Sequence, residues 1–263
     1  MLESLFMVFQ PIVRLTSGEV VGYEALGRGT EAPLQLLDRA LREGRLAELD
    51  WIFQELAVGV ARTGAWDSQH LLFINVDTRV DTDPLARAEQ LQRAAENAGL
   101  KAGQLAVELG ERGPSLDAVE VLAHTYRQAG FQVALDDVGA GYASLSSVVR
   151  ARPDIVKLDI ALVRGVATDP LRAQLMRALA HFSREAGVPL VAEGIEDFAD
   201  VRALLQCGVE YGQGFALGMP ASDPTRVTSQ ICDRLCEIAA SIPPQPSLLV
   251  QSPASIGALA ARR

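Results

Sequence analysis

The sequence predicts an α/β protein built as a modified (β/α)8 TIM-type barrel with an N-terminal antiparallel hairpin. Two observations support this fold class. Short β-rich runs alternate with stretches of helical periodicity, and the first two β-rich runs are separated only by the turn sequence TSGE. Counting the hairpin, eight strands fall within about 250 residues, the size of one such barrel. A doubly wound open sheet is the alternative.

The expected elements follow one another in a regular order. The runs MVFQPIVRL and VVGYEAL form the hairpin. A helix follows, in which Leu49, Phe53, Leu56 and Val60 recur at helical spacing. The later strands are expected at 71–76, 104–109, 131–137, 154–159, 189–195 and 211–217.

The remaining segments are helices and a tail. Helices are expected at 115–129 and 170–186, the second with Leu171, Leu175, Leu179 and Phe182 on one stripe. A last amphipathic helix is expected over 224–240. We therefore expect one barrel domain over residues 1–240, followed over 241–263 by a tail or linker that contains proline and serine.

The composition limits the classes of ligand. The 263 residues carry a formal charge of −9, whereas sequence-independent binding to long nucleic acid needs a basic surface. A small anionic ligand is still compatible with this charge. No apolar run of about 18 residues and no signal-peptide pattern is present, so we expect no membrane span and a cytoplasmic location. The three cysteines, Cys207, Cys232 and Cys236, lack metal-ligand spacing and are expected in the core or on the surface.

Polar residues stand in or just after seven successive strands, where a barrel of this kind carries its chemistry. They are Glu24, Asn75, Glu108, the pair Asp136 and Asp137, Lys157, Glu193 and Gln213. Each alone has an ordinary explanation as a helix cap, a turn residue or a lysine that reaches solvent. Their common position at one rim is hard to explain in that way.

Five carboxylates and one amide oxygen form a set of hard oxygen ligands, which suits Mg²⁺ or Mn²⁺. The three histidines, His70, His124 and His181, are too dispersed for a zinc site. Adjacent carboxylates at the end of a buried strand also repel each other unless a cation or a shared proton compensates them. The pattern predicts a site for two ions that clamp a phosphate and activate a water, the arrangement that hydrolyses phosphodiesters.

Eight ordered motifs carry a resemblance to a known family. FQPIV, GYEALGR, FINVD, VELGE, LDDVGAGYASL, VKLD, AEGIED and QGFALGMP occur over roughly residues 7–221. In order and spacing they resemble the EAL-domain cyclic di-GMP phosphodiesterases. The resemblance implies a modified (β/α)8 barrel that uses Mg²⁺ or Mn²⁺ to cleave cyclic di-GMP to linear pGpG. It also implies a homodimer and regulation by a fused sensor or a protein partner.

The resemblance also implies roles for individual residues. Glu24, Asn75, Glu108 and Asp136 match ligands of one ion, and Asp136 and Asp137 match ligands of the second. Glu193 matches a glutamate that either binds metal or handles the proton of the attacking water. Lys157 and Gln213 match residues that position that water. The positions that match substrate contacts are Gln10, Leu26, Arg28, Asp159, Glu196 and Phe215, and Glu111 matches an anchor of the loop after the paired aspartates.

Several positions depart from the family pattern. The loop that usually reads DDFGTGYSSL has Val138, Ala140 and Ala143, which implies reduced activity. The other departures are Gly29 for tryptophan, Asp77 for serine, Gly110 for threonine and Phe215 for tyrosine. Two interpretations follow: a phosphodiesterase, or a catalytically weak cyclic di-GMP receptor that acts through a protein partner. The complete ligand set favours the enzyme. A glycosidase with two carboxylates explains neither Asn75 nor the paired aspartates.

Overall fold

The computed structural model describes residues 4–63, 66–67, 69–80, 83–110, 115–140 and 145–243. Its eight strands close into a barrel in sequence order, so the alternative of an open sheet is wrong. The strands are β1 (Phe6–Arg14), β2 (Val20–Arg28), β3 (Leu71–Val76), β4 (Leu105–Leu109), β5 (Gln132–Val138), β6 (Ile155–Leu158), β7 (Leu190–Ala192) and β8 (Tyr211–Gly212). Strand β1 is antiparallel to both β2 and β8, and every other pair is parallel. The predicted barrel with an N-terminal hairpin is therefore confirmed.

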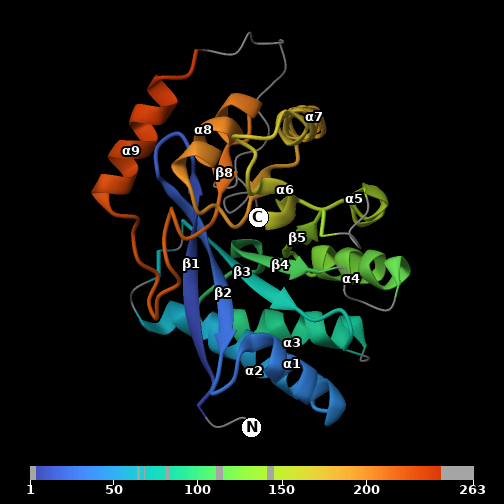
Figure 1. Cartoon of the computed structure of the whole chain (residues 1–263). Coiled ribbons are helices and arrows are strands. Elements are labelled where there is room, and N and C mark those ends of the chain that lie inside the picture. The colour runs from blue at the N-terminus through green and yellow to red at the C-terminus, as the bar shows by residue number, and fades with distance from the viewer. Residues whose placement is uncertain are drawn as a thin grey trace.

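Helices cover the outside of this barrel (Figure 1). They are α1 (Pro33–Arg42), α2 (Leu46–Val58), α3 (Pro84–Asn97), α4 (Leu116–Gln128), α5 (Leu145–Ala151), α6 (Ile160–Val163), α7 (Pro170–Ala186), α8 (Phe198–Cys207) and α9 (Ser229–Ala240). Short 3₁₀ turns lie at Gly59–Thr63 and Ala102–Gln104. Within the described residues, no helix combines the length and the apolar character that crossing a bilayer requires.

Local sequence explains where many of these helices begin. In six of them a side-chain oxygen before the first turn accepts a backbone N–H of that turn, which satisfies an otherwise unpaired donor. The capping residues are Asp83, Ser115, Asp159, Asp169, Asp197 and Thr228. The last of these caps explains why α9 begins at Ser229, although the periodicity predicted a helix from residue 224.

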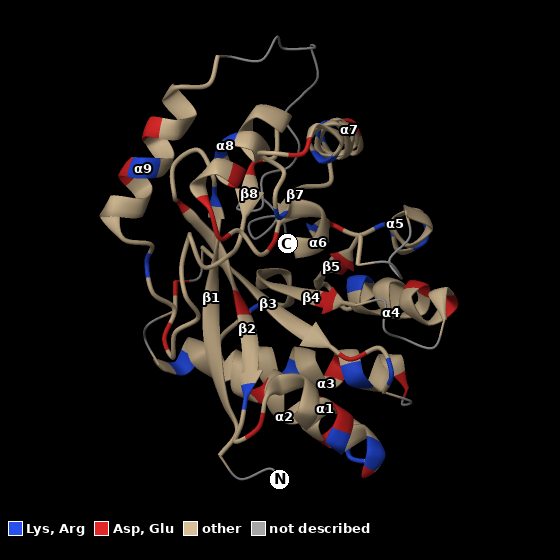
Figure 2. Ribbon diagram, in the orientation of Figure 1, with Lys and Arg blue, Asp and Glu red and all other residues tan. Residues whose placement is uncertain are grey.

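The inside of the barrel is filled by an apolar layer. Its members include Ile12, Leu71, Phe73, Ala106, Ala134, Ile155, Val191 and Tyr211. Most of them stand two residues before the polar residue of the same strand, and side chains two apart on a strand share a face. The layer therefore forms the floor on which the polar side chains rest. Figure 2 shows acidic residues on β2, β4 and β5, whereas most of the charge lies on the helices and loops.

Two expectations about individual elements are wrong. Strands β7 and β8 are shorter than predicted, because the chain leaves the sheet after Ala192 and after Gly212. The apolar stripe of α7 also does not face the barrel: Leu171 is 75% exposed, and the buried residues of this helix are Met176, Ala180 and Ser183. The inward face of α7 is formed by Met176, Ala180 and Ser183, and Leu179 is the member of the stripe that packs, partly buried, against the core.

Candidate metal centre

The polar side chains of distant strands meet above the apolar layer. The Gln213 amide Nε2 donates hydrogen bonds to Glu24 Oε2 at 2.7 Å and to Gln10 Oε1 at 3.1 Å. The Asn75 amide Nδ2 donates to Glu24 Oε1 at 3.2 Å. Both oxygens of Glu24 are thus engaged by side chains from β3 and from the segment after β8. Closure of the barrel brings these positions together although Gln10 and Gln213 are 203 positions apart in the chain.

Lys157 on β6 lies in the middle of the carboxylates. Its ammonium Nζ is 2.5 Å from Glu108 Oε1 and 2.6 Å from Glu193 Oε1. It is also 3.2 Å from Glu24 Oε2 and 3.3 Å from Asp136 Oδ1. The lysine side chain is only 1% exposed. One buried cation therefore faces four carboxylates from four other parts of the barrel.

The carboxylates of this cluster have pKa values that are shifted in different directions. Burial raises the pKa of Glu108 well above its usual range, and the charge of Glu24 raises it further. Burial and the charge of Asp136 do the same to the pKa of Glu193. Burial alone would raise the pKa of Glu24, but Lys157 and the donated hydrogen bonds outweigh it and lower the pKa. The pKa of Lys157 is raised, because the surrounding carboxylates outweigh its own burial.

An irregularity in β5 explains how two adjacent aspartates serve one site. In a regular strand, neighbouring side chains point to opposite faces. Here the pairing of β5 with β6 shifts between Leu135 and Val138, and Asp137 has a left-handed backbone with φ of 57°. As a result, Asp136, Asp137 and Glu193 can bring oxygen atoms within 4.8 Å of one another. The bulge creates the acidic pair that the strand alternation alone would separate.

The backbone of Asp137 gives a testable prediction about stability. Asparagine tolerates the left-handed region because its short polar side chain can hydrogen-bond to the nearby backbone. Alanine has no such group, and the left-handed conformation costs it about 1 kcal/mol or more. Both Asp137→Asn and Asp137→Ala remove the same charge, so their difference isolates the backbone effect. Chemical unfolding in EDTA should show the asparagine variant to be more stable than the alanine variant by about 1 kcal/mol. Equal stabilities would contradict a strained conformation at this position.

Close packing of the backbone places Glu193 and Gln213. Each is followed by a glycine, and a Cβ at either position would collide with a neighbour. At Gly194 the neighbour is the Ile160 side chain, and at Gly214 it is the backbone N and O of Ile195. The segments after β7 and β8 can therefore approach each other only with glycine at these points.

The oxygen atoms of the cluster fit divalent cations. Glu108 Oε2 is buried and accepts no hydrogen bond from the described residues, and the buried oxygens Glu108 Oε1, Asp136 Oδ1 and Glu193 Oε1 have the Lys157 ammonium as their shared partner. Buried carboxylate oxygens without donors are costly unless a cation binds them. Oxygen ligands without sulfur or imidazole are those that Mg²⁺ and Mn²⁺ prefer. The residues expected to bind metal are thus brought together, and their individual roles stay predictions.

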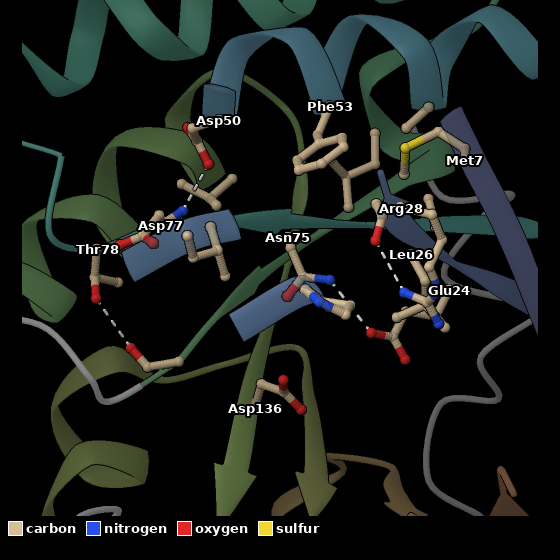
Figure 3. Close-up of a pocket in the computed structure, with 18 of the residues that line it drawn as sticks. Met7, Glu24, Leu26, Arg28, Asp50, Phe53, Asn75, Asp77, Thr78 and Asp136 are labelled. Atoms are coloured by element: carbon tan, nitrogen blue, oxygen red, sulfur yellow. Dashed lines mark hydrogen bonds between the residues drawn. The ribbon is translucent and has the colours of Figure 1, made fainter. Parts of the chain in front are cut away.

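Two cavities flank this cluster. The first has a volume of about 260 Å³ and reaches from Asn75, Asp136 and Asp137 to the apolar side chains of Leu26 and Phe53 (Figure 3). Arg28 also lines it, and its guanidinium donates to the Gly27 carbonyl. The second cavity, of about 190 Å³, is lined by Gln10, Glu193, Glu196, Gln213 and Phe215, among others. Glu24 lines both cavities, so the residues expected to bind metal lie between two spaces.

The residues expected to contact substrate differ in their exposure and in the contacts that they already make within the protein. Phe215 is 58% exposed at the second cavity and offers a ring face. Glu196 forms an ion pair with Arg164. Asp159 caps α6 by accepting the N–H of Ala161, so contact with substrate would have to coexist with this cap. Glu111 and Ala143 lie outside the described residues, and their predicted roles are untested.

The sequence reasoning missed a buried network beside the first cavity. Asp50 on α2 accepts the backbone N–H of Asp77 at 2.9 Å, Arg87 Nη2 at 2.9 Å and Gln54 Nε2 at 2.7 Å. Asp77 is also paired with Arg79. This network holds the turn that follows Asn75. The available signal was that Asp50 and Gln54 stand one helical turn apart, but the other partners, Asp77 and Arg87, are distant in sequence.

A family model described as the EAL domain matches residues 2–220, and the chain therefore belongs to the EAL domain family. The chain is 31% identical over 238 residues to the probable cyclic di-GMP phosphodiesterase PdeB of Escherichia coli. This match covers 84% of the chain and 44% of PdeB. The chain spans less than half the length of the curated relatives that it matches first.

Solved structures show the same architecture. A standalone EAL protein from Vibrio cholerae O395 with bound c-di-GMP has a TM-score of 0.78 and 26% identity, covering 88% of this chain and 99% of that one. Klebsiella pneumoniae BlrP1 in complex with calcium and cyclic di-GMP has a TM-score of 0.76 and 26% identity, covering 86% and 58%. A second BlrP1 complex contains manganese, with a TM-score of 0.73, 26% identity and coverage of 83% and 56%.

Proposed function

We propose that this chain is a metal-dependent phosphodiesterase that hydrolyses cyclic di-GMP to linear pGpG. The observation that carries the proposal is the buried cluster of carboxylates, with one lysine among them, which lies between two cavities. A cyclic dinucleotide has two bases joined through phosphates, so one base in each cavity would bring a phosphate near the cluster. The relatives named above, and the ligands in their structures, support the same substrate.

Two ions, Mg²⁺ or Mn²⁺, would be held by Glu24, Asn75, Glu108, Asp136 and Asp137, with Glu193 at the edge of the second position. When bound, they supply polarisation of the phosphate and a lower pKa of the attacking water. Arg28 has the planar donor fork that suits a phosphate oxygen, and it lines the first cavity. Phe215 offers a surface for stacking a base in the second.

The reaction consumes one water. Its oxygen attacks phosphorus, and the bond from phosphorus to the ribose 3′ oxygen breaks. Lys157 and Gln213 would orient the water through their N–H groups. A carboxylate has two oxygens, so Glu193 can bind an ion through one and accept the water's proton with the other. The departing 3′ oxygen takes a proton from solvent. The product has a 5′ phosphate and a free 3′ hydroxyl, as pGpG requires.

Assembly and regulation are part of the proposal. Leu145 and Val149 of α5 and Leu171 and Leu175 of α7 are exposed apolar side chains on two helices of the barrel, and they would suit a homodimer contact. Because the curated relatives are more than twice as long, we also propose control by a fused sensor or a separate partner in the cytoplasm.

Product analysis tests the proposal. Purified protein is incubated with cyclic di-GMP in Mn²⁺, Mg²⁺ or EDTA, and the nucleotides are separated by chromatography. We expect pGpG to accumulate with metal and not with EDTA. Because Val138 and Ala140 alter the loop beside the aspartates, turnover should be slow and should rise with Mn²⁺ concentration. Binding of cyclic di-GMP without product at any Mn²⁺ concentration would support the receptor function instead.

A further inference from the structure

Lys157 has features that its proposed contact with water does not require. Its Nζ lies within 3.3 Å of an oxygen from each of four carboxylates. The sequence contains lysine at only two positions, 101 and 157, although lysine and arginine together number 24. The remaining 22 basic residues (24 − 2) are arginines. One of the two lysines therefore stands at the centre of the cluster, in a chain in which nearly all basic residues are arginines.

The lysine cannot satisfy all of the oxygens around it. An ammonium group has three N–H donors, which is one fewer than the carboxylates that surround it. Its Nζ is closest to Glu108 Oε1 and Glu193 Oε1, at 2.5 and 2.6 Å. The second oxygen of Glu108 is buried and receives no hydrogen bond from the described residues. The cluster therefore has unused capacity to bind a cation.

From these contacts we infer that Lys157 is the counter-cation of the metal-free cluster, and that its ammonium must leave the space between Glu24, Glu108 and Asp136 when a metal ion binds there. The inference rests on the proposed metal centre. Mg²⁺ needs its oxygen ligands at about 2.0–2.1 Å. Nζ is at 2.5–3.3 Å from the same oxygens, so an ion bound by those oxygens and the ammonium cannot share this position.

Charge arithmetic agrees with a lysine that moves but stays charged. In the metal-bound state all five carboxylates have to be ionised; Glu24, Glu108, Asp136, Asp137 and Glu193 then sum to −5, and Lys157 adds +1, which leaves −4. Two divalent ions add +4 and bring the centre to zero. Lysine also suits this displacement better than arginine would, because it is a compact charge on a flexible stem and not a broad planar group.

The two lysines allow a direct test by NMR of protein with ¹³Cε-labelled lysine. Lys101 is exposed and remote from the cluster, so it is an internal control. Adding Mg²⁺ to the protein in EDTA-treated buffer should shift the Lys157 signal and leave the Lys101 signal unchanged. Calorimetry on the same sample reports whether Mg²⁺ binds. An unchanged Lys157 signal while Mg²⁺ binds would overturn the inference.

A pair of variants separates this inference from the proposed function. In EDTA, Lys157→Met should unfold at a lower temperature than the natural protein, since four carboxylates lose their cation. Its Mg²⁺ affinity should be at least about tenfold higher, and Mg²⁺ should raise its unfolding temperature more. Lys101→Met should match the natural protein in all three measurements. Unchanged stability in EDTA for Lys157→Met would overturn the counter-cation, whereas no binding of Mg²⁺ or Mn²⁺ by the natural protein would overturn the metal centre.

Discussion

Glu24→Ala should lower metal-dependent release of pGpG by about a thousandfold, equivalent to about 4 kcal/mol of activation free energy. The substitution removes a proposed metal ligand. It also leaves the amides of Asn75 and Gln213 and the ammonium of Lys157 without the acceptor that they share in the structure. Gln213 keeps its bond to Gln10 and Lys157 keeps three carboxylates, but all three donors lose the group that fixes their positions, so the effect should exceed the loss of a single ligand.

Initial rates of pGpG formation at saturating Mn²⁺ measure this effect. Circular dichroism establishes that the barrel is still folded. Glu89→Ala is the matched control, because Glu89 is a half-exposed glutamate on α3 whose carboxylate meets only a surface arginine among the ion pairs of the described residues. The control should retain full activity. Turnover by Glu24→Ala equal to that of the control would remove Glu24 from the active site.

Asp50→Ala should lower the free energy of unfolding by about 3 kcal/mol or more. The carboxylate of Asp50 and the guanidinium of Arg87 are 2.9 Å apart, with side-chain exposures of 9% and 10%. Removing one partner leaves a nearly buried charge uncompensated, and it also frees the backbone N–H of Asp77. The turn after Asn75 should loosen as a consequence.

Urea unfolding of Asp50→Ala, Arg87→Met and the double variant measures the coupling between the two residues. The double variant should be more stable than the sum of the single effects predicts, because neither charge is then left alone. Glu48→Ala on the same helix is the control: its ion pair with Arg45 is exposed, so its loss should leave the free energy of unfolding almost unchanged. A loss of similar size in Glu48→Ala and Asp50→Ala would contradict the importance of burial.

Strand periodicity explains why the site could be predicted so fully from sequence. Side chains two positions apart share one face of a strand, as Ala106 and Glu108 do on β4 and Ile155 and Lys157 on β6. An apolar residue followed two positions later by a polar one therefore indicates an apolar layer inside the barrel with a polar site above it. Where a backbone departs from regular geometry, the sequence is less informative. The alternation rule separates Asp136 from Asp137, and only the bulge in β5 unites them.

Contacts between distant segments account for the remaining differences. Nothing in the local sequence of Asp50 indicates Arg87, which is 37 positions away. The stripe of α7 was visible as a pattern, but periodicity alone does not say which face turns inward. In the structure the inward face of α7 is the one that carries Met176, Ala180 and Ser183. Strands β7 and β8 end early where Gly194 and Gly214 allow the chain to bend, and hydrophobic content alone overestimated their length.

The most direct test of the metal centre is anomalous diffraction from crystals grown with Mn²⁺. The account predicts two manganese peaks. One should contact the oxygens of Glu24, Asn75, Glu108 and Asp136, and the other those of Asp136 and Asp137, with the Lys157 ammonium displaced from the first position. Manganese bound only at surface carboxylates, with Lys157 still among its four carboxylates at saturating Mn²⁺, would contradict it.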